Sequence, residues 1–257
     1  MRIGEAILLA FSKEPEEIDS NIYPIPVGQE LSLLRREYPN FTSLVNGKRV
    51  ADYGCGLGLQ AIALVRDEHC IVTGIDTSTK NLGKARYFLS CSGIDKRRID
   101  FVERPTPEMQ RAFDVVFSLN SVEHFSDPES TLREIISLVR PGGIIMISFG
   151  SAWLSPRGSH MEKFCPLPWL NILFDEETIM RVRARYSKDG AKRYVEVAGG
   201  LNMMTIAKFE KLIRNNGLTV FYKSSRAIKG WNFLAKLPLV REFFTTQMSI
   251  LATVATD

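Results

Sequence analysis

The chain has 257 residues, of which 45% are hydrophobic and 24% charged, so it can build a large core and its composition excludes general disorder. Its formal net charge of +4 tolerates an anionic ligand without indicating nucleic acid as a partner. No apolar run approaches the roughly 20 residues of a membrane-spanning helix. The four cysteines lack a paired metal spacing and no signal peptide is visible, so we expect a cytoplasmic protein with reduced thiols.

Helical patches, a turn-rich piece at 23–28 and a predicted helix over 30–38 make up residues 1 to about 47. Strands and helices then alternate. The patterning predicts strands over 48–53, 70–76, 99–103, 113–120 and 144–149, and helices over 59–66, 78–90 and 128–139. The triplet Pro141-Gly142-Gly143 is expected to turn the chain into the last of these strands. Such alternation predicts a parallel sheet with helices on both faces.

The alternation stops after Gly150. Residues 150–203 are rich in Pro, Trp and Arg and are interpreted as an insertion. A helix over 205–215 and strands over 218–224 and 248–254 are predicted after it. The apolar and aromatic segment 231–244 lies between those strands. It could contact a membrane or an apolar acceptor, pack on the sheet, or pair two subunits as a homodimer.

Three glycines alternate in the stretch V-A-D-Y-G-C-G-L-G-L-Q-A, residues 50–61, directly after a predicted strand. Glycine is favoured where a ligand approaches the backbone or where φ is positive. The pattern Gly56-x-Gly58-x-x-Ala61 would fit a dinucleotide, and Asp52-x-Gly54-x-Gly56-x-Gly58 would fit another nucleoside ligand. Asp76 follows about 20 residues later, where a carboxylate accepts hydrogen bonds from ribose hydroxyls, and it suits both ligands.

Further motifs distinguish these ligands. Asp52 precedes the glycines, F-D-V-V-F-S-L-N forms a fourth strand with a polar end, and L-R-E-I-I-S-L-V-R-P-G-G-I-I-M-I-S leads into a fifth. In this order and spacing the chain resembles the class I S-adenosylmethionine-dependent methyltransferases that act on small molecules, chiefly over residues 47–149. The resemblance implies an α/β, Rossmann-like, doubly wound seven-stranded sheet with an antiparallel last strand.

The resemblance also implies one domain over 1–257. It comprises an N-terminal helical cover (1–47), a cofactor-binding core (48–149), a substrate-binding insertion (150–203) and a C-terminal helix with strands (204–257). The residues expected to bind S-adenosylmethionine are Asp52, Gly54, Gly56, Gly58, Asp76, Thr77, Glu103, Asn120 and Ser121. The glycines would line the methionine part, Asp76 the ribose and Thr77 the adenine. The Gly-Asp pair that usually ends the third strand is missing here, which weakens the expected adenine contact of Glu103.

Methyl transfer to oxygen requires a proton acceptor or a metal beside the activated methyl group. His124 follows the fourth strand and His160 lies in the insertion, so both are candidates. The hypothesis is that His160 is the general base, with His124 and Glu123 around the acceptor. The alternative is that both histidines are structural. His124, His160 and Glu162 are suitable metal ligands by type, but no spacing signature supports them and no metal is predicted.

Methyl transfer to a small molecule, at a hydroxyl oxygen and in biosynthesis, is the function we expect. N- or C-methylation, a nicotinamide-dependent oxidoreductase and a non-catalytic cofactor-binding subunit remain alternatives. The oxidoreductase lacks a Tyr-x-x-x-Lys pair, because Gly190 stands four places after Tyr186. DNA-base methylation is disfavoured because L-N-S-V replaces an N-P-P-Y tetrad. The basic run 181–193 could hold an anionic substrate or form a solvated helix face.

Overall fold

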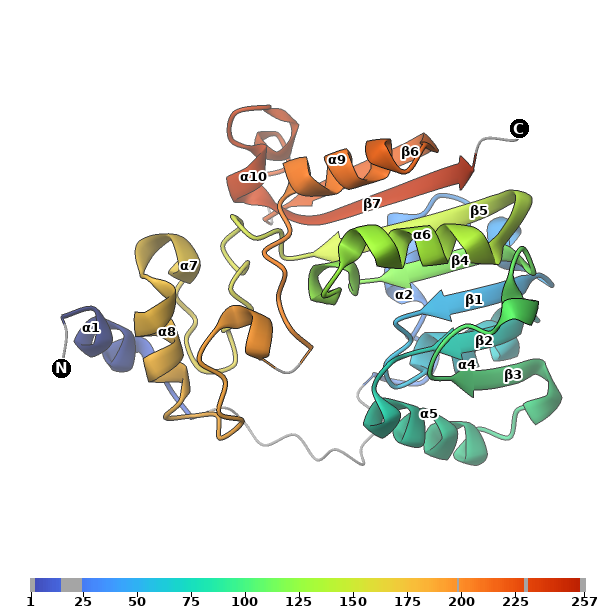
Figure 1. The fold of residues 1–257 in the computed structure, drawn as a ribbon, viewed down its shortest axis with the longest axis horizontal. Helices are drawn as coiled ribbons and strands as arrows, with labels where there is room; N and C mark the ends of the chain where they lie inside the picture. Colours follow the sequence, from blue (N-terminus) through green and yellow to red (C-terminus); the bar gives the residue numbers. More distant parts are fainter. Residues whose placement is uncertain (1–2, 15–24, 198, 229–230, 255–257) are drawn as a thin grey trace.

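A computed structural model describes residues 3–14, 25–197, 199–228 and 231–254, so part of the turn-rich piece at 23–28 lies outside the described residues. One seven-stranded sheet runs in the order β3-β2-β1-β4-β5-β7-β6 (Figure 1). Strand β7 is antiparallel to both β5 and β6, as predicted for the last strand. The strands are β1 (Arg49–Tyr53), β2 (Ile71–Ile75), β3 (Ile99–Val102), β4 (Phe113–Leu119), β5 (Val139–Gly150), β6 (Leu218–Ala227) and β7 (Thr245–Val254).

Helices cover both faces of the sheet, because each carries an apolar stripe that packs on the strands. One face holds α2 (Ser32–Glu37), α3 (Phe41–Val45), α4 (Leu59–Glu68) and α5 (Thr79–Cys91), and the other holds α6 (Pro128–Leu138) and α9 (Ile206–Asn215). Side chains of Ser78, Asp127 and Thr205 accept hydrogen bonds at the N-termini of α5, α6 and α9. These caps fix where each helix begins.

The insertion has a hydrophobic core of its own. It contains α7 (Leu170–Leu173) and α8 (Glu176–Arg183), and α1 (Ile3–Phe11) packs against α8 (Figure 1). The buried residues of this core include Leu8, Met161, Leu170, Ile179 and Tyr194. The N-terminal residues therefore divide between two places, since α2 and α3 cover the sheet whereas α1 completes the insertion.

Strand β5 differs from its predicted bounds. It begins at Val139, and the expected turn at residues 141–143 is an irregularity inside it, where the register with β4 shifts between Phe113 and Val115. The backbone of Gly142 has a φ of 71°, which glycine adopts without strain. Strands β6 and β7 are each three residues longer than predicted.

Short elements complete the fold. They are α10 (Arg241–Phe244) and the 3₁₀ turns Lys96–Arg98, Pro107–Met109, Val122–His124, Tyr194–Glu196 and Leu234–Lys236. Within the described ranges, none of the helices combines the length and the apolar character needed to cross a membrane. Strand β1 lies between β2 and β4, so the chain changes direction across the sheet at β1. Ligands of open α/β sheets bind at the carboxyl ends of the strands beside such a point.

Candidate functional site

The glycine loop after β1 rests on the end of β2. The backbone N–H groups of Gly54 and Cys55 donate to the carbonyl oxygen of Ile75 at 2.8 and 3.0 Å. Gly58 has a φ of 70°, and a Cβ there would lie 2.5 Å from the ring of Phe101. Gly56 has a φ of 52° and nothing within 4 Å of such a Cβ. The loop is therefore compressed against the core on one side and open at Gly56 on the other.

Two carboxylates flank this loop. Asp52 is buried, its Oδ2 has no hydrogen-bond partner, and burial together with the charge of Asp76 raises its pKa. Asp76 accepts the N–H of Gly56 through Oδ2 and that of Ser78 through Oδ1, both at 2.8 Å. A buried carboxylate oxygen without a partner suits a cationic group. The loop thus fits the cationic methionine part of S-adenosylmethionine, and Asp76 retains lone pairs for hydroxyl groups.

The other expected cofactor residues follow the neighbouring strands. Thr77 and Glu103 are exposed directly beyond β2 and β3. The hydroxyl of Ser121 donates to the carbonyl of Gly54 at 3.3 Å, and a Cβ on Gly54 would lie 2.5 Å from that hydroxyl. Ser121 therefore braces the loop through its side chain, in addition to any backbone contact with the cofactor.

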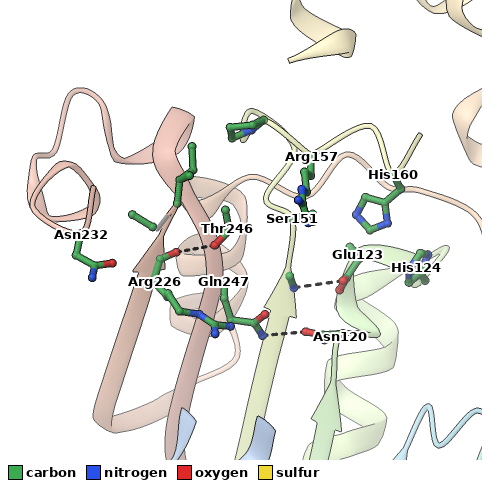
Figure 2. Close-up of a pocket in the computed structure, with 14 residues that line it drawn as sticks. Asn120, Glu123, His124, Ser151, Arg157, His160, Arg226, Asn232, Thr246 and Gln247 are labelled. Carbon is green, nitrogen blue, oxygen red and sulfur yellow. Dashed lines mark hydrogen bonds between the residues drawn. The ribbon is translucent and has the colours of Figure 1, made fainter. Parts of the chain in front are cut away.

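A cavity of about 790 Å³ opens at the carboxyl ends of β4, β5 and β6, next to the start of β7. Figure 2 shows that side chains from the sheet and from the insertion face it. The residues that line it are Asn120, Glu123, His124, Gly150, Ser151, Pro156, Arg157, His160, Arg226, Ala227, Ile228, Asn232, Thr246 and Gln247. Both histidines predicted from the sequence lie in this wall. Asn120 is also the one expected cofactor residue in it.

The carboxylate of Glu123 is buried in the cavity wall and only half of its hydrogen-bonding capacity is used. Its side chain is 5% exposed, Oε1 accepts the N–H of Gly150 at 3.3 Å, and Oε2 has no hydrogen-bond partner. Burial raises the pKa of this carboxyl group to about 7. A carboxylate with a pKa near neutrality, at the wall of a cavity, can accept a proton under physiological conditions.

The two histidines pack edge to face, with ring centroids 5.4 Å apart and planes at 83°. Nδ1 of His124 lies 2.7 Å from the carbonyl oxygen of Gly200, so it donates its proton to that oxygen. Burial and the proximity of His124 lower the pKa of His160 to about 4. Nε2 of His160 is buried and has no partner. His160 is thus a neutral imidazole near pH 7.

Glu162, the third ligand considered for a metal, is absent from the cavity wall. Among the residues that the structure describes, no three His, Cys, Asp or Glu side chains form a group that could hold a metal ion.

Three non-glycine residues of the cavity wall have strained backbones. Asn120, Ser151 and His160 all have left-handed backbones, with φ of 52°, 56° and 55°. Such conformations cost non-glycine residues about 1–3 kcal/mol each and persist where the surroundings enforce them. Three of them in one wall point to a site whose side chains are held in place for a function.

Several cavity residues were not expected from the sequence, because β6 and β7 supply them. Gln247 donates from Nε2 to Oδ1 of Asn120 at 2.8 Å, joining the two strand ends across the cavity. Arg226 forms an ion pair with the buried Glu37 at 2.9 Å. Gln247 directly precedes the largely apolar run M-S-I-L-A of β7, and no local sequence signal marks it as a cavity residue.

Large aromatic residues of the insertion, Trp153, Trp169 and Phe174, lie outside the cavity wall. Trp153 packs against Tyr194 and Trp169 against Phe244.

Three of the six cations in the basic run 181–193 form ion pairs with neighbouring acids. Arg181 pairs with Glu5 and Glu177, Arg183 with Asp189, and Arg193 with Glu176. These pairs account for half of its cations without any bound substrate.

Comparisons with known proteins agree with this geometry. Residues 29–223 match the family described as methyltransferase domain. A ubiquinone biosynthesis O-methyltransferase of Chromobacterium violaceum is 37% identical over 132 residues, which cover 51% of this chain and 55% of that protein. One of Salmonella arizonae is 32% identical over 152 residues, covering 52% and 62%. The chain therefore spans little more than half the length of these relatives.

Solved structures share the fold at low sequence identity. An S-adenosylmethionine-dependent methyltransferase of Mesorhizobium loti is 18% identical with a TM-score of 0.55, and the match covers 88% of this chain and 98% of that one.

Proposed function

Because the chain belongs to the S-adenosylmethionine-dependent methyltransferases, we propose that it methylates a hydroxyl oxygen of a small molecule in biosynthetic metabolism. The observation that carries this proposal is the cavity at the ends of β4 and β5. It shares Asn120 with the expected cofactor residues and holds two unpartnered proton acceptors, Glu123 Oε2 and His160 Nε2. An oxygen nucleophile needs such an acceptor, since its proton must leave as the new bond forms.

The relatives support oxygen as the methylated atom, since those from C. violaceum and S. arizonae are both named O-methyltransferases. Because the chain belongs to this family, a nicotinamide-dependent oxidoreductase is excluded. N- and C-methylation use the same fold and remain outcomes of the test below.

The residues of the chain have separate tasks in the proposed reaction. S-adenosylmethionine supplies an activated methyl group, so the protein need not create a strong electrophile. Asp52 and Asp76 would hold the cofactor, while Asn120, which accepts a hydrogen bond from Gln247, would lie between cofactor and acceptor. Glu123 or His160 would take the hydroxyl proton as the acceptor oxygen bonds to the methyl carbon, while the bond from that carbon to the cofactor sulfur breaks and S-adenosylhomocysteine leaves. The side chains around the cavity would orient the acceptor, so that methyl transfer would proceed as an intramolecular step.

Cofactor binding is the first test. Calorimetric titration with S-adenosylmethionine, S-adenosylhomocysteine and NAD should give binding of the two sulfur ligands only. Asp76→Ala should weaken the affinity for both sulfur ligands about hundredfold, because the substitution removes hydrogen bonds to a charged acceptor. Asp95→Ala is a suitable control, since Asp95 is an exposed carboxylate before β3. Binding of NAD alone would refute the proposal.

The methylated atom is the second test. Hydroxyl and amine acceptors would be screened with and without added divalent metal, and the position of the methyl group determined by mass spectrometry. We expect methyl ethers. Methylated amines or carbon atoms would refute oxygen as the acceptor atom while leaving the methyltransferase assignment intact.

A further inference from the structure

Residues 231–244, here called the aromatic lobe, project from the sheet between β6 and β7 (Figure 1). The rings of Trp231 and Phe244 stack with centroids 5.5 Å apart. Trp169 of the insertion meets Phe244 edge to face, and its Nε1 donates to the carbonyl of Phe243 at 3.2 Å. These aromatic contacts and the hydrogen bond from Trp169 hold the lobe beside the insertion.

The outer side of the lobe is apolar. Leu239 is 91% exposed, Phe233 63% and Trp231 50%, and Leu237 and Phe243 are exposed as well. Ile172 and Leu173, which follow Trp169 closely in the chain, are also exposed. Single exposed apolar residues are common on protein surfaces, but a group gathered in one projecting segment indicates an interaction site.

The charges of the lobe favour an anionic partner. Its one acidic residue, Glu242, turns away from the tip and accepts the N–H groups of Ile206 and Ala207 at 2.9 and 2.7 Å, capping α9. Arg241 is paired with Glu210 at 2.6 Å. Lys236 is exposed among the apolar side chains. A surface of aromatic residues, leucines and a lysine, without an outward carboxylate, suits the headgroup layer of an anionic bilayer.

The lobe is continuous with the cavity. Asn232 of the lobe and Ile228 before it both line the cavity, and Figure 2 shows Asn232 on the side of Arg226. The cavity therefore opens at the foot of the exposed apolar surface. A projecting tip with a few large apolar side chains suits insertion among lipid headgroups. A stable protein partner usually buries a broader area of about 800 Å² on each side.

We propose that the aromatic lobe docks on an anionic lipid bilayer and that the cavity receives an amphiphilic, hydroxyl-bearing acceptor from it. The polar end of this acceptor enters between Arg226 and Glu123, and its apolar part remains along the lobe and in the bilayer. The proposal of membrane docking depends only on the features of the lobe. The proposal of an amphiphilic acceptor also depends on the proposed function.

Vesicle sedimentation tests the docking surface. Phosphatidylcholine vesicles containing phosphatidylglycerol should sediment the wild-type protein, and Phe233→Ser/Leu239→Ser should bind at least about tenfold more weakly, because each side chain loses apolar burial. Tyr87→Ser, a change at a comparably exposed aromatic residue of α5, should bind like wild type. Lys236→Glu should weaken binding to the anionic vesicles but not to pure phosphatidylcholine.

Three results would overturn this proposal: wild type that stays in the supernatant, a double variant that binds like wild type, or a double variant that turns a dimer into a monomer in gel filtration. Calorimetry with S-adenosylmethionine, run on the same variants, should give wild-type affinity and so shows that they are folded.

The acceptor class has its own readout. The double variant should retain turnover on a short-chain, water-soluble hydroxyl acceptor and lose about tenfold on the long-chain form presented in vesicles. Equal losses on both forms would refute the amphiphilic acceptor. If vesicles bind but no acceptor is methylated, the proposed function fails while the docking surface stands.

Discussion

Replacing Glu123 by Gln tests how much the buried carboxylate costs in free energy of unfolding, independently of any role in proton transfer. The Gln side chain has nearly the same shape, and its oxygen can still accept the N–H of Gly150, which lies 3.3 Å from Oε1. The substitution removes only the charge and the titration. Because Oε2 of Glu123 is buried without a partner, wild-type protein must hold an uncompensated charge whenever this group ionises.

The magnitude follows from the pKa of Glu123, which burial raises from 4.5 to about 7. A folded-state pKa above the unfolded value means that folding favours the protonated form. Its stabilising contribution is complete below about pH 4.5 and is lost as the pH rises through about 7. Between pH 5 and pH 8 wild type should lose about 2.5 kcal/mol relative to Glu123→Gln, from the linkage of the two pKa values. For a domain of this size the difference amounts to roughly 5–10 °C in melting temperature.

Thermal denaturation at pH 5 and pH 8, followed by circular dichroism, measures this difference without any substrate. The variant should melt near wild type at pH 5 and well above it at pH 8. Glu108→Gln, a change at an exposed carboxylate on the surface, should not reproduce this pattern. A difference between wild type and Glu123→Gln that is the same at both pH values would refute the claim that Glu123 is buried without a counter-charge.

The remaining predictions concern proton transfer and the glycine loop. If Glu123 takes the proton, kcat/KM for the acceptor should rise with pH with a midpoint of about 7, whereas a profile that is flat above pH 5 would assign the role to His160, whose pKa is about 4. His160→Ala should lower turnover about 10²–10⁴-fold and leave cofactor affinity unchanged, and full residual activity would remove it from the mechanism. Gly58→Ala should weaken cofactor binding and destabilise the fold by about 1–3 kcal/mol or more, because its Cβ would meet Phe101 in a left-handed backbone. Gly93→Ala has the same backbone strain with open space around it, and equal losses in both variants would show that the contact with Phe101 is unimportant.

The cofactor half of the molecule was predictable because its signals are local. The three glycines and Asp52 lie within seven positions, and strand patterning placed β1 to β4 to within about one residue. The irregular start of β5 was missed, since Pro-Gly-Gly usually ends one element and here belongs to a strand whose register shifts. The packing of α1 on α8 was also missed, because both are short amphipathic helices and either could have covered the sheet.

The acceptor half was predictable only in part, because its residues meet through the fold. His124 and His160 could be proposed from their positions after the fourth and fifth strands. Gln247 could not, since it reaches Asn120 across 127 positions of sequence and depends on the antiparallel insertion of β7 between β5 and β6. A histidine in a left-handed conformation, such as His160, likewise has no signature in the sequence.

The division between the two halves also limits what relatives can reveal about the acceptor. The family match ends at residue 223, before Arg226, Asn232 and Gln247 of the cavity wall and before the whole aromatic lobe. In this fold the glycine loop needs only to fit one cofactor, whereas the wall built by the insertion, β6 and β7 must fit the acceptor. Residues outside the matched range therefore supply part of this wall, and we propose that they contribute to the choice of acceptor. Substitutions at Asn232 or Gln247 should change the preference among acceptors while S-adenosylmethionine affinity stays constant.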